Sequence, residues 1–378
     1  MIRIAYVINS LEGGGAALPV PAVARVLTKT HGARVAVFAL TRRNGRAAQP
    51  MIDAGLEVRV REGSEAGHLG AGLWLDRELG AWKPDLIWTS LTRATLLGQL
   101  VGRWRGVPVV SWQHNAFLKP ANRLLLRATQ GLSTHWVGDS DSVTALTATR
   151  LGIGPDRLSA WPLFMADAEA PQARAWSAGD VLKLGSLGRL HRAKGYDILI
   201  NALVRMRAQG FRAVTPFEIT IAGEGAEQPA LEAALAAAGI ENVRLSGFEA
   251  RPKEVLAGLH LYLQPSRAEG LCIAAHEAMQ AGLPAIVSSV GELPYSVHDG
   301  VTGLVVPPIN AEALAQALVW CLSHPERLAD MGVAARSRIL KRFSPQAFED
   351  AGASVLSRLN LRTASAAIPS LSRLGDVR

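Results

Sequence analysis

Two glutamates with seven residues between them, Glu269 and Glu277, have the types and spacing that most favour chemistry in this sequence. Glu269 stands in a loop after an apolar run, and Glu277 falls two turns into the helix expected next. Carboxylates accept hydrogen bonds from sugar and ribose hydroxyls, and the amides of residues 270–273 at the positive end of that helix can donate. The pair predicts a site for a hydroxyl-rich ligand. The alternative for Glu277 is a salt bridge within the fold.

A basic loop between an expected strand and an expected helix, residues 188–195, is the second candidate. Arg189, His191, Arg192 and Lys194 place four cationic or titratable side chains in six positions. Their mutual repulsion is costly unless an anion neutralises it. A pyrophosphate fits, with arginine as a planar fork and lysine as a point charge. A solvated basic loop is the alternative.

Three consecutive glycines, Gly13, Gly14 and Gly15, follow the first expected strand and precede a helix. Glycines let backbone amides approach an anion at a helix start. The G-x-G-x-x-G fingerprint is absent, so a phosphate- or sugar-facing loop is favoured over an NAD site. A plain tight turn is the alternative.

His114 and Asn115 follow the fifth expected strand, at the carboxyl end where ligand-binding residues belong. A lone histidine is more often structural. The sequence shows no Ser–His–Asp order, no His-x-Glu metal spacing and no Walker loop. A tightly bound metal or other cofactor is therefore not expected.

These loops must be positioned by short apolar runs that alternate with helical stretches. Nearly continuous apolar runs predict parallel strands covered on both faces. Six runs precede residue 140 and six follow residue 180. The expected strands are 2–9, 33–40, 56–61, 85–89, 107–112 and 134–138, then 182–188, 217–222, 243–245, 259–264, 284–288 and 304–306. The pattern predicts two doubly wound α/β domains.

Composition agrees with a two-domain globular protein. The chain has 378 residues, of which 49% are hydrophobic and 19% charged, and no apolar run is long enough to span a membrane. It opens on a strand-like MIRIAYVINS rather than a signal peptide, and it has two cysteines, so a reducing cytoplasm is expected.

Charge is unevenly distributed. Of the net +8, residues 1–175 carry 20 Lys and Arg against 13 Asp and Glu, and eight of the nine Trp lie before residue 177. A basic, Trp-rich half suits an anionic partner, which could be a membrane surface, a phosphorylated lipid or nucleic acid. The alternative is genome bias toward arginine, because the basic residues are scattered.

Taken together, these segments resemble the retaining glycosyltransferases of family 4, which have the GT-B fold. The likeness covers most of the chain. Each fragment alone is a weak signal, but their order and spacing are specific, and Glu269 and Glu277 match the family's E-x7-E signature. The matching segments are GRLHRAKGYDILINAL, IAGEG, LSGF, QPSRAEGLCIAAHEAMQAGLPAIVSSVGELPYSVHDGVTGLVVPP and KRFS.

The resemblance implies a role for each matching donor-side residue. Arg189 and Lys194 would hold the pyrophosphate of the donor, Glu277 would bind the ribose, and Glu269 would bind the donor sugar. Gly14 and Gly15 would close over the phosphates. The donor-binding set is Gly14, Gly15, Arg189, Lys194, Arg251, Ser266, Glu269, Gly270, Leu271, Cys272 and Glu277.

The resemblance also implies a catalytic set of Glu269, His114, Arg189 and Lys194, with His114 beside the reacting sugar. Gly13, His114 and Asn115 form the acceptor side. The chemistry implied is metal-independent and retains the anomeric configuration, with leaving-group charge stabilised by fixed cations and dipoles.

The GT-B fold implies two Rossmann-like domains that face each other across a cleft, with a C-terminal helix crossing back to the first. The expected parts are an acceptor-binding domain at 1–165, a linker at 166–180, a nucleotide-sugar-binding domain at 181–343, a crossover helix at 344–361 and a flexible tail at 362–378. The sequence departs from the family at residues 161–165, where a different turn is usual, and at Leu271-Cys272, where aromatic-Gly is common.

The leading hypothesis is transfer of a sugar, expected to be a hexose, from a UDP- or GDP-sugar to a glycan or lipid-linked acceptor, in cell-surface polysaccharide or lipopolysaccharide biosynthesis. We expect a cytoplasmic protein, peripheral on the inner face of the cytoplasmic membrane. Two alternatives stay open: a nucleotide-sugar epimerase on the same scaffold, and a non-catalytic nucleotide-sugar or nucleic-acid binding module. The absence of nucleic-acid motifs argues against a nucleic-acid partner. The sequence leaves the base, sugar, acceptor and oligomeric state open.

Overall fold

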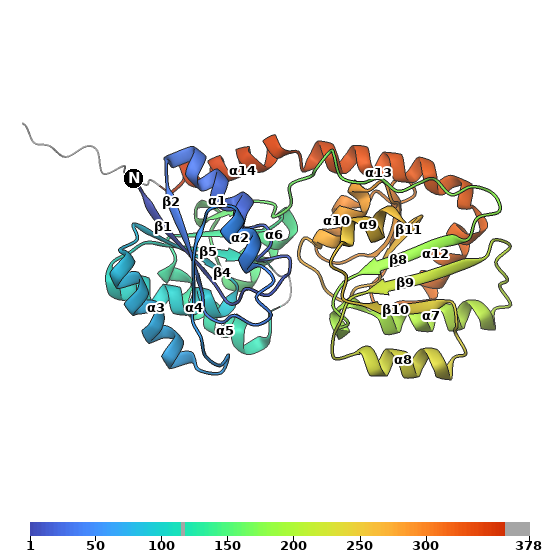
Figure 1. Cartoon of the computed structure of the whole chain (residues 1–378), viewed down its shortest axis with the longest axis horizontal. Helices are drawn as coiled ribbons and strands as arrows, with labels where there is room; N and C mark the ends of the chain where they lie inside the picture. Colours follow the sequence, from blue (N-terminus) through green and yellow to red (C-terminus); the bar gives the residue numbers. More distant parts are fainter. Residues whose placement is uncertain (115–117, 360–378) are drawn as a thin grey trace, which may run out of the picture. The chain divides into compact units, whose positions relative to one another are not determined.

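The computed structural model describes residues 1–114 and 118–359 and contains two sheets (Figure 1). The first sheet has seven strands in the order β3-β2-β1-β4-β5-β6-β7, and the second has six in the order β10-β9-β8-β11-β12-β13. Strand β1 pairs in parallel with both β2 and β4, and β8 with both β9 and β11. The strand order reverses beside β1 and beside β8, and such switch points are where doubly wound sheets bind ligands.

The strands of the first sheet are β1 Arg3–Ile8, β2 Arg34–Ala39, β3 Glu57–Val60, β4 Leu86–Ser90, β5 Val109–Gln113, β6 His135–Gly138 and β7 Leu158–Ala160. The helices among them are α1 Val20–His31, α2 Ala48–Asp53, α3 His68–Trp82, α4 Thr92–Arg105, α5 Pro120–Thr129 and α6 Asp141–Leu151.

The strands of the second sheet are β8 Leu182–Leu187, β9 Phe217–Ala222, β10 Val243–Gly247, β11 Leu261–Gln264, β12 Ala285–Ser288 and β13 Gly303–Val306. The helices that follow β8 are α7 Tyr196–Ala208, α8 Gln228–Ala237, α9 Pro252–Ala257, α10 Ile273–Gln280, α11 Leu293–Ser296, α12 Ala311–Ser323, α13 Leu328–Arg342 and α14 Pro345–Ser357.

All twelve strands predicted from the sequence are present, with ends that differ by a few residues. The structure adds β7, which pairs in parallel with β6 and was not predicted. Its three residues include a serine, so they lack the long apolar run that identified the others. A short edge strand can form because its neighbour supplies the hydrogen-bond partners.

Both sheets are covered on both faces, which explains their apolar strands. Every residue of β4, β5, β11 and β12 is buried. In the second sheet α12 packs on α7, and α13 packs on α10, so the helices form two separate layers. Figure 1 shows α7 and α8 along one side of this sheet and α9 and α10 along the other.

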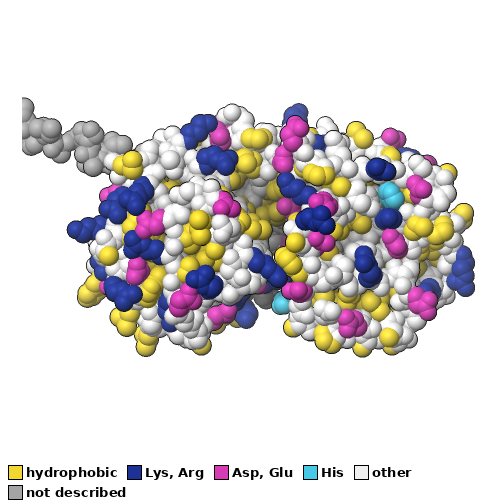
Figure 2. Space-filling view, viewed as in Figure 1, with side chains coloured by type: hydrophobic (Ala, Val, Ile, Leu, Met, Phe, Trp, Pro, Cys, Tyr) yellow, Lys and Arg dark blue, Asp and Glu magenta, His cyan; other side chains and the backbone are white. Residues whose placement is uncertain are grey.

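The described chain separates into two compact units. One comprises 1–111, 131–135 and the end of α14, and the other comprises 112–114, 118–130 and 136–351. Within residues 1–114 and 118–359, no helix is long and apolar enough to cross a membrane. On the face seen in Figure 2, lysine and arginine side chains are interspersed with aspartate and glutamate.

The segment 161–165, which departs from the family's usual turn, continues the edge of the first sheet. The Trp161 amide donates to the carbonyl of Gly138 at 2.9 Å. The Trp161 ring is fully buried and stacks on Trp112, with ring centroids 5.0 Å apart. Phe348 of α14 lies 5.4 Å from the same ring. Aromatic packing therefore stabilises this segment in place of the usual turn.

Candidate active site

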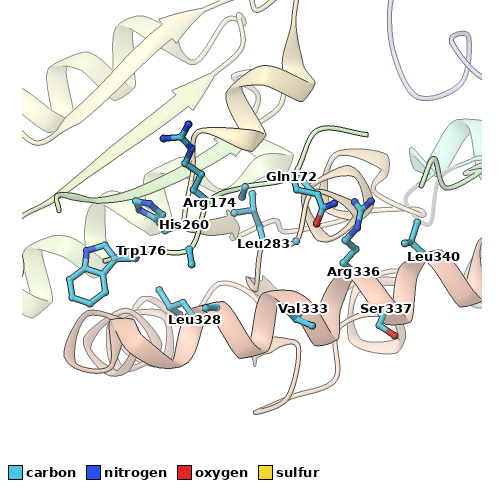
Figure 3. Close-up of a pocket in the computed structure, with 15 residues that line it drawn as sticks. Gln172, Arg174, Trp176, His260, Leu283, Leu328, Val333, Arg336, Ser337 and Leu340 are labelled. Atoms are coloured by element: carbon cyan, nitrogen blue, oxygen red, sulfur yellow. The ribbon is translucent and has the colours of Figure 1, made fainter. Parts of the chain in front are cut away.

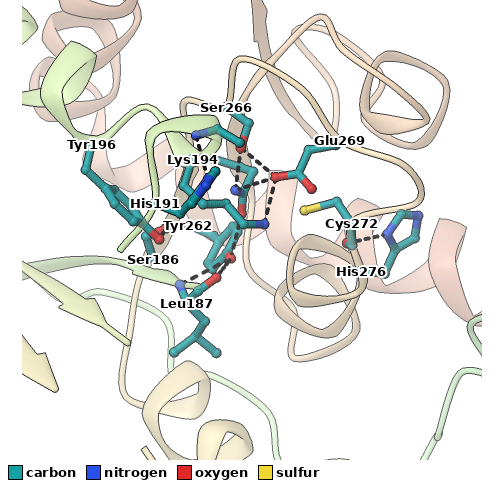
Figure 4. Close-up of polar contacts among 12 residues, drawn as sticks. Ser186, Leu187, His191, Lys194, Tyr196, Tyr262, Ser266, Glu269, Cys272 and His276 are labelled. Carbon is teal, nitrogen blue, oxygen red and sulfur yellow. Dashed lines mark hydrogen bonds and ion pairs between the residues drawn. The ribbon is translucent and has the colours of Figure 1, made fainter. Parts of the chain in front are cut away.

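Glu269 lies in the loop between β11 and α10, and one of its two carboxylate oxygens accepts three hydrogen bonds (Figure 4). The donors to Oε1 are Ser266 Oγ at 2.6 Å, Lys194 Nζ at 2.8 Å and Gln264 Nε2 at 3.1 Å. Glu269 is only 8% exposed. Three donors on one oxygen fix the direction of the carboxylate, and its other oxygen, Oε2, takes no part in these three bonds.

The orientation of Gln264 is set from inside the sheet by Tyr262. The Tyr262 hydroxyl lies 2.9 Å from Gln264 Oε1 and 3.2 Å from both the amide and the carbonyl of Leu187. The Tyr262 hydroxyl accepts a hydrogen bond from the Leu187 amide. Its own proton is shared between Gln264 Oε1 and the Leu187 carbonyl oxygen. Because Gln264 Oε1 faces a donor, its amide nitrogen must point at Ser266 and Glu269. Tyr262 and Gln264 were not predicted from the sequence, and the only signal was a glutamine ending an apolar strand.

Lys194 supplies the positive charge next to Glu269. Its side chain is 20% exposed and its ammonium is 2.8 Å from Glu269 Oε1. Burial alone would lower the pKa of Lys194, but the neighbouring Glu269 carboxylate raises it. The lysine therefore remains protonated at neutral pH. The structure thus brings together two residues that the sequence predicted for sugar and pyrophosphate binding.

The basic loop is shaped by glycine and by an ion pair. Gly195 has φ +70° and begins α7, and a side chain there would place its Cβ 2.0 Å from the Pro265 carbonyl oxygen. Only glycine fits so close an approach. Arg267 forms a two-pronged pair with Asp197, with both N–O distances 2.6 Å. Arg189 is exposed and makes no ion pair with any described residue, so its guanidinium is available to a phosphate.

Cys272 begins α10 with φ +64°, a left-handed conformation that favours glycine. This explains the family's preference for glycine at the position. Cys272 is buried, and burial, reinforced by the Glu269 charge, raises the pKa of its thiol to about 12. Cys272 therefore stays a neutral thiol beside the carboxylate and is not a nucleophile at neutral pH.

Glu277 lies on α10 and is partly exposed, with no ion pair to a described residue. Burial raises its pKa, while Lys253 of the adjacent α9 acts in the opposite direction. The salt bridge that the sequence allowed as an alternative is not formed. Arg251, directly before α9, is exposed and pairs with Glu254 at 2.9 Å.

His276 has a structural environment. Its Nδ1 lies 2.9 Å from the Cys272 carbonyl oxygen and its Nε2 lies 2.8 Å from Ser296 Oγ. A carbonyl only accepts, so Nδ1 carries the proton and Nε2 accepts from the serine. Burial lowers the pKa of His276 to about 4. The neutral ring joins α10 to α11.

The glycine triplet forms an irregular turn between β1 and α1. The Gly14 carbonyl accepts from the amides of Ala17 and Leu18, both at 3.0 Å, and the Gly13 amide donates to Asn44 Oδ1 at 3.3 Å. Gly13 and Gly15 are exposed. The turn occupies the carboxyl end of β1, beside the switch point, but the described contacts assign no ligand to it.

His114 and Asp139 follow the strands β5 and β6 and lie side by side, with His114 Nδ1 3.9 Å from Asp139 Oδ2. Burial lowers the pKa of His114 to about 3, so the ring is neutral. Burial and, next, the charge of Glu292 raise the pKa of Asp139 well above its usual range. Asp139 was not predicted, because one acidic residue after a short strand carries no distinctive pattern. Asn115, which was also predicted on the acceptor side with His114 and Gly13, lies outside the described residues.

Gly270 brings His114 next to the Glu269 loop within one compact unit. A Cβ at Gly270 would lie 2.2 Å from the His114 carbonyl oxygen and 3.4 Å from Asp139 Oδ2. Glycine is therefore required for this close approach. Two segments separated by more than 150 residues in the chain thus meet at the predicted site.

A separate pocket of about 340 Å³ lies between residues 172–176 and α13 (Figure 3). It is lined by Trp176, Leu328 and Val333 among others, and by His260 and Leu283, which precede β11 and β12. It therefore lies at the amino ends of these strands. Glu269 and Lys194 follow the carboxyl ends of strands, so this pocket is not part of the candidate site. Among the described residues, no cluster of three or more His, Cys, Asp and Glu could hold a metal ion.

Two family models match the chain. Residues 13–165 match the model described as Glycosyltransferase Family 4, and residues 182–324 match the model described as Glycosyl transferases group 1. Glycogen synthase of Mycobacterium tuberculosis is 30% identical over 325 residues, which is 76% of this chain and 73% of that protein. The chain belongs to the family 4, group 1 glycosyltransferases with the GT-B fold.

Other relatives match over a smaller part of their length. The amylovoran biosynthesis glycosyltransferase of Erwinia amylovora is 29% identical over 223 residues, 57% of this chain and 51% of that protein. The chain spans about half the length of the curated relatives that it matches most strongly. Among solved structures, Anabaena HepE in complex with UDP-glucose superposes with a TM-score of 0.80 at 20% identity, covering 94% of this chain and 100% of that one. This last likeness shows the fold.

Proposed function

We propose that the protein is a retaining, metal-independent glycosyltransferase that moves a sugar, expected to be a hexose, from a UDP- or GDP-sugar to a glycan or lipid-linked acceptor. The observation that carries this proposal is the Lys194–Glu269 pair, in which Glu269 is fixed through one oxygen. Family membership supports glycosyl transfer over the alternatives of an epimerase and a non-catalytic binding module.

The chemistry follows from charge placement. As the bond between sugar and phosphate breaks, the leaving diphosphate gains negative charge and the sugar carbon gains positive charge. Lys194 and Arg189 would stabilise the negative charge on the diphosphate. The fixed Glu269 carboxylate would bind a sugar hydroxyl beside the positively charged sugar carbon. Preorganised charges of this kind lower a barrier without reorganising during the reaction. A metal is unnecessary in this scheme because the two cations perform its electrostatic task.

The remaining donor-side assignments belong to the same proposal. Glu277, with no ion-pair partner among the described residues, would accept from the ribose hydroxyls. Gly14, Gly15 and the amides of 270–272 would bind phosphate and sugar, and Arg251 and Ser266 would lie near the nucleotide. Ser266 Oγ donates to Glu269 in the structure, so its first task is to hold that carboxylate.

On the acceptor side, neutral His114 would accept a hydrogen bond from, or donate one to, the reacting hydroxyl, with Gly13 and Asn115 nearby. We propose the 1–165 part as the acceptor-binding domain and 181–343 as the donor-binding domain. A relative named for amylovoran biosynthesis supports a role in cell-surface polysaccharide or lipopolysaccharide assembly. Action on a lipid-linked acceptor would place the protein in the cytoplasm, at the inner face of the membrane.

The direct test is release of nucleoside diphosphate from a panel of UDP- and GDP-sugars, with and without a membrane extract as acceptor source. We expect one donor to be consumed, with activity retained in EDTA, lost by at least about 100-fold in Glu269→Gln, and retained in Glu312→Gln. Glu312 is an exposed control that pairs with Arg205 on the helical layer. Conversion of the sugar without release of diphosphate would establish the epimerase instead.

A further inference from the structure

Two arginines at the carboxyl edge of the first sheet have no carboxylate partner among the described residues. Arg61 directly follows β3, and Arg93 is the second residue of α4, which follows β4. Both side chains are partly buried. Both side chains donate hydrogen bonds to carbonyl oxygens: Arg61 Nη1 to Ser64 at 3.2 Å and Arg93 Nη2 to Gly67 at 3.3 Å. Carbonyls orient a guanidinium but leave its charge uncompensated.

The two guanidinium groups converge on the same short loop. A Cβ at Gly67 would lie 3.1 Å from Arg61 Nη2, and the Gly67 carbonyl accepts from Arg93 Nη2. A Cβ at Gly70 would also lie 3.3 Å from Arg61 Nη2. Glycines at these positions make room for Arg61 beside the backbone. Both arginines therefore approach the loop at residue 67.

The neighbouring carboxylates are already engaged by other arginines. Glu62 pairs with Arg42 at 2.5 Å, and Glu65 pairs with Arg43, which also binds Glu12. Because both acidic residues of the loop are occupied, neither is available to pair with Arg61 or Arg93. This edge of the sheet therefore keeps an excess of positive charge.

Arg93 is the member of the pair whose charge and hydrogen-bond donors are less well satisfied. Its Nε is buried from solvent and has no hydrogen-bond partner. Burial, followed by repulsion from Arg61, lowers its pKa, and the opposing attraction of Glu65 is smaller. A buried donor without a partner costs free energy that an anion would restore. Such an arrangement is unfavourable in a structural ion-pair network and is expected in a site that awaits an anionic ligand.

The local backbone is also favourable to an anion. The loop leads into α3, whose first turn contains no acidic residue and whose start, at Gly67, has no side-chain cap. The positive end of a 15-residue helix thus adds to the two guanidinium charges. Ligands of doubly wound sheets bind at the carboxyl ends of the strands, which is where Arg61 and Arg93 lie.

We propose that Arg61 and Arg93 form a phosphate-binding site, and that it receives the phosphate or pyrophosphate group of the glycosyl acceptor. Two guanidinium forks suit the oxygens of a phosphate group better than a single carboxylate. The acceptor assignment rests on the proposed glycosyl transfer, whereas the anion site itself does not. The phosphate could belong to a lipid headgroup or to a soluble sugar phosphate, and these share one chemistry.

The test measures binding of inorganic pyrophosphate to the full chain by calorimetry at low ionic strength, where such contacts are least screened. The preferred nucleoside diphosphate is first added to saturation, so that the proposed donor site is occupied. We expect one further pyrophosphate to bind, and the double variant Arg61→Gln/Arg93→Gln to bind it at least about tenfold more weakly. Arg42→Gln, which removes a paired arginine from the same edge, is the matched control.

Thermal unfolding of the double variant checks that it folds, which we expect because it removes an unpartnered buried charge. Unchanged pyrophosphate binding in the double variant would overturn the site. Loss of pyrophosphate binding on saturation with nucleoside diphosphate would overturn the acceptor assignment, because the arginines would then serve the donor. Both results come from binding measurements and do not depend on sugar transfer. Failure of this anion site can therefore be told apart from failure of the proposed glycosyl transfer.

Vesicles separate the two sources of phosphate. If the double variant loses sedimentation with phosphatidic acid vesicles but Arg42→Gln does not, the group belongs to a lipid. If only free pyrophosphate is affected, the acceptor is a soluble phosphate. Vesicles of phosphatidylcholine, which lack an exposed phosphomonoester, provide the background in both cases.

Discussion

At the scale of single residues, the site depends on how firmly Glu269 is held. Three donors fix one of its oxygens, and the chain Leu187–Tyr262–Gln264 determines where one of those donors points. A buried polar network of this kind specifies a geometry because every member constrains the next. The side chains behind Glu269 are therefore positioning residues, and in the proposed mechanism they would act through its carboxylate.

Tyr262→Phe tests this relay. Without the hydroxyl, Gln264 Oε1 loses a donor, and the amide can turn its oxygen toward Glu269. We expect turnover of the nucleotide sugar to fall about tenfold, because a buried hydrogen bond contributes about 1 kcal/mol and its loss also releases the carboxylate. Binding of the bare nucleoside diphosphate should stay unchanged, since no sugar is present.

Tyr196→Phe is the control for that experiment, because its buried hydroxyl contacts Ser186 at 3.2 Å and not Gln264. If Tyr262→Phe and Tyr196→Phe reduce turnover equally, or if Tyr262→Phe weakens diphosphate binding as much as sugar transfer, the relay has no specific effect on Glu269.

Cys272 gives a second prediction at this scale. Its φ of +64° is strained for any residue with a Cβ, by about 1–2 kcal/mol, and glycine removes that strain. At positions with negative φ, alanine ordinarily gives a more stable protein than glycine. Here Cys272→Gly should be more stable than Cys272→Ala by about 1 kcal/mol in urea unfolding. The usual order, with alanine more stable, would show that the left-handed conformation is not maintained in solution.

Some of the site could be predicted at this scale and some could not. Glu269, Lys194 and Arg189 were predictable, because charged residues at the carboxyl ends of apolar strands have few structural explanations. Tyr262 and Asp139 were not, since a tyrosine inside a strand or an aspartate after one is common. Tyr262 is held by Leu187, 75 residues away, and Asp139 lies near Gly270 of a distant segment, contacts that the sequence does not reveal.

At the scale of elements, α10 carries much of the proposed donor site, with Cys272 directly before its first residue and Glu277 within it. His276 attaches α10 to α11 through the Cys272 carbonyl and Ser296 Oγ. The ring must be neutral to accept from Ser296, so the attachment depends on pH. Most element positions followed from apolar periodicity, while the three-residue β7 did not, because its pairing with β6 determines it.

The pH dependence of stability tests this attachment. The pKa of His276 falls from 6.5 to about 4 on folding, so between these values the unfolded chain binds a proton that the folded chain does not. Its contribution to stability is present above pH 6.5 and is lost as the pH falls toward 4. In His276→Asn, the slope of unfolding free energy against pH in this window should be lower by up to about 1.4 kcal/mol per pH unit.

The slope of unfolding free energy against pH also contains contributions from His114, Asp139 and Glu277. These contributions are the same in the wild type and in His276→Asn, so they cancel in the comparison. Urea unfolding at several values from pH 4.5 to 7 provides the measurement. Equal slopes for the wild type and His276→Asn would mean that His276 titrates normally in the folded state.

At the scale of the whole molecule, two doubly wound sheets provide two carboxyl edges, and each has its own set of cations. Lys194 and Arg189 lie at the edge of the second sheet, and Arg61 and Arg93 lie at that of the first. The fold was predictable because twelve apolar runs in two series allow few other arrangements. The second cationic set was not singled out, because its arginines are dispersed over more than 30 residues of sequence.

The most direct test of the central claim is calorimetric titration with UDP and with GDP. The wild type should bind one of them clearly better than the other, and Arg189→Ala/Lys194→Ala should weaken that binding at least about tenfold, as expected for lost charge-assisted hydrogen bonds. The Arg61→Gln/Arg93→Gln variant should bind the same nucleotide as well as the wild type. If neither nucleotide binds, or if the loss of Arg189 and Lys194 has no effect, the Lys194–Glu269 constellation is not a donor site for a UDP- or GDP-sugar.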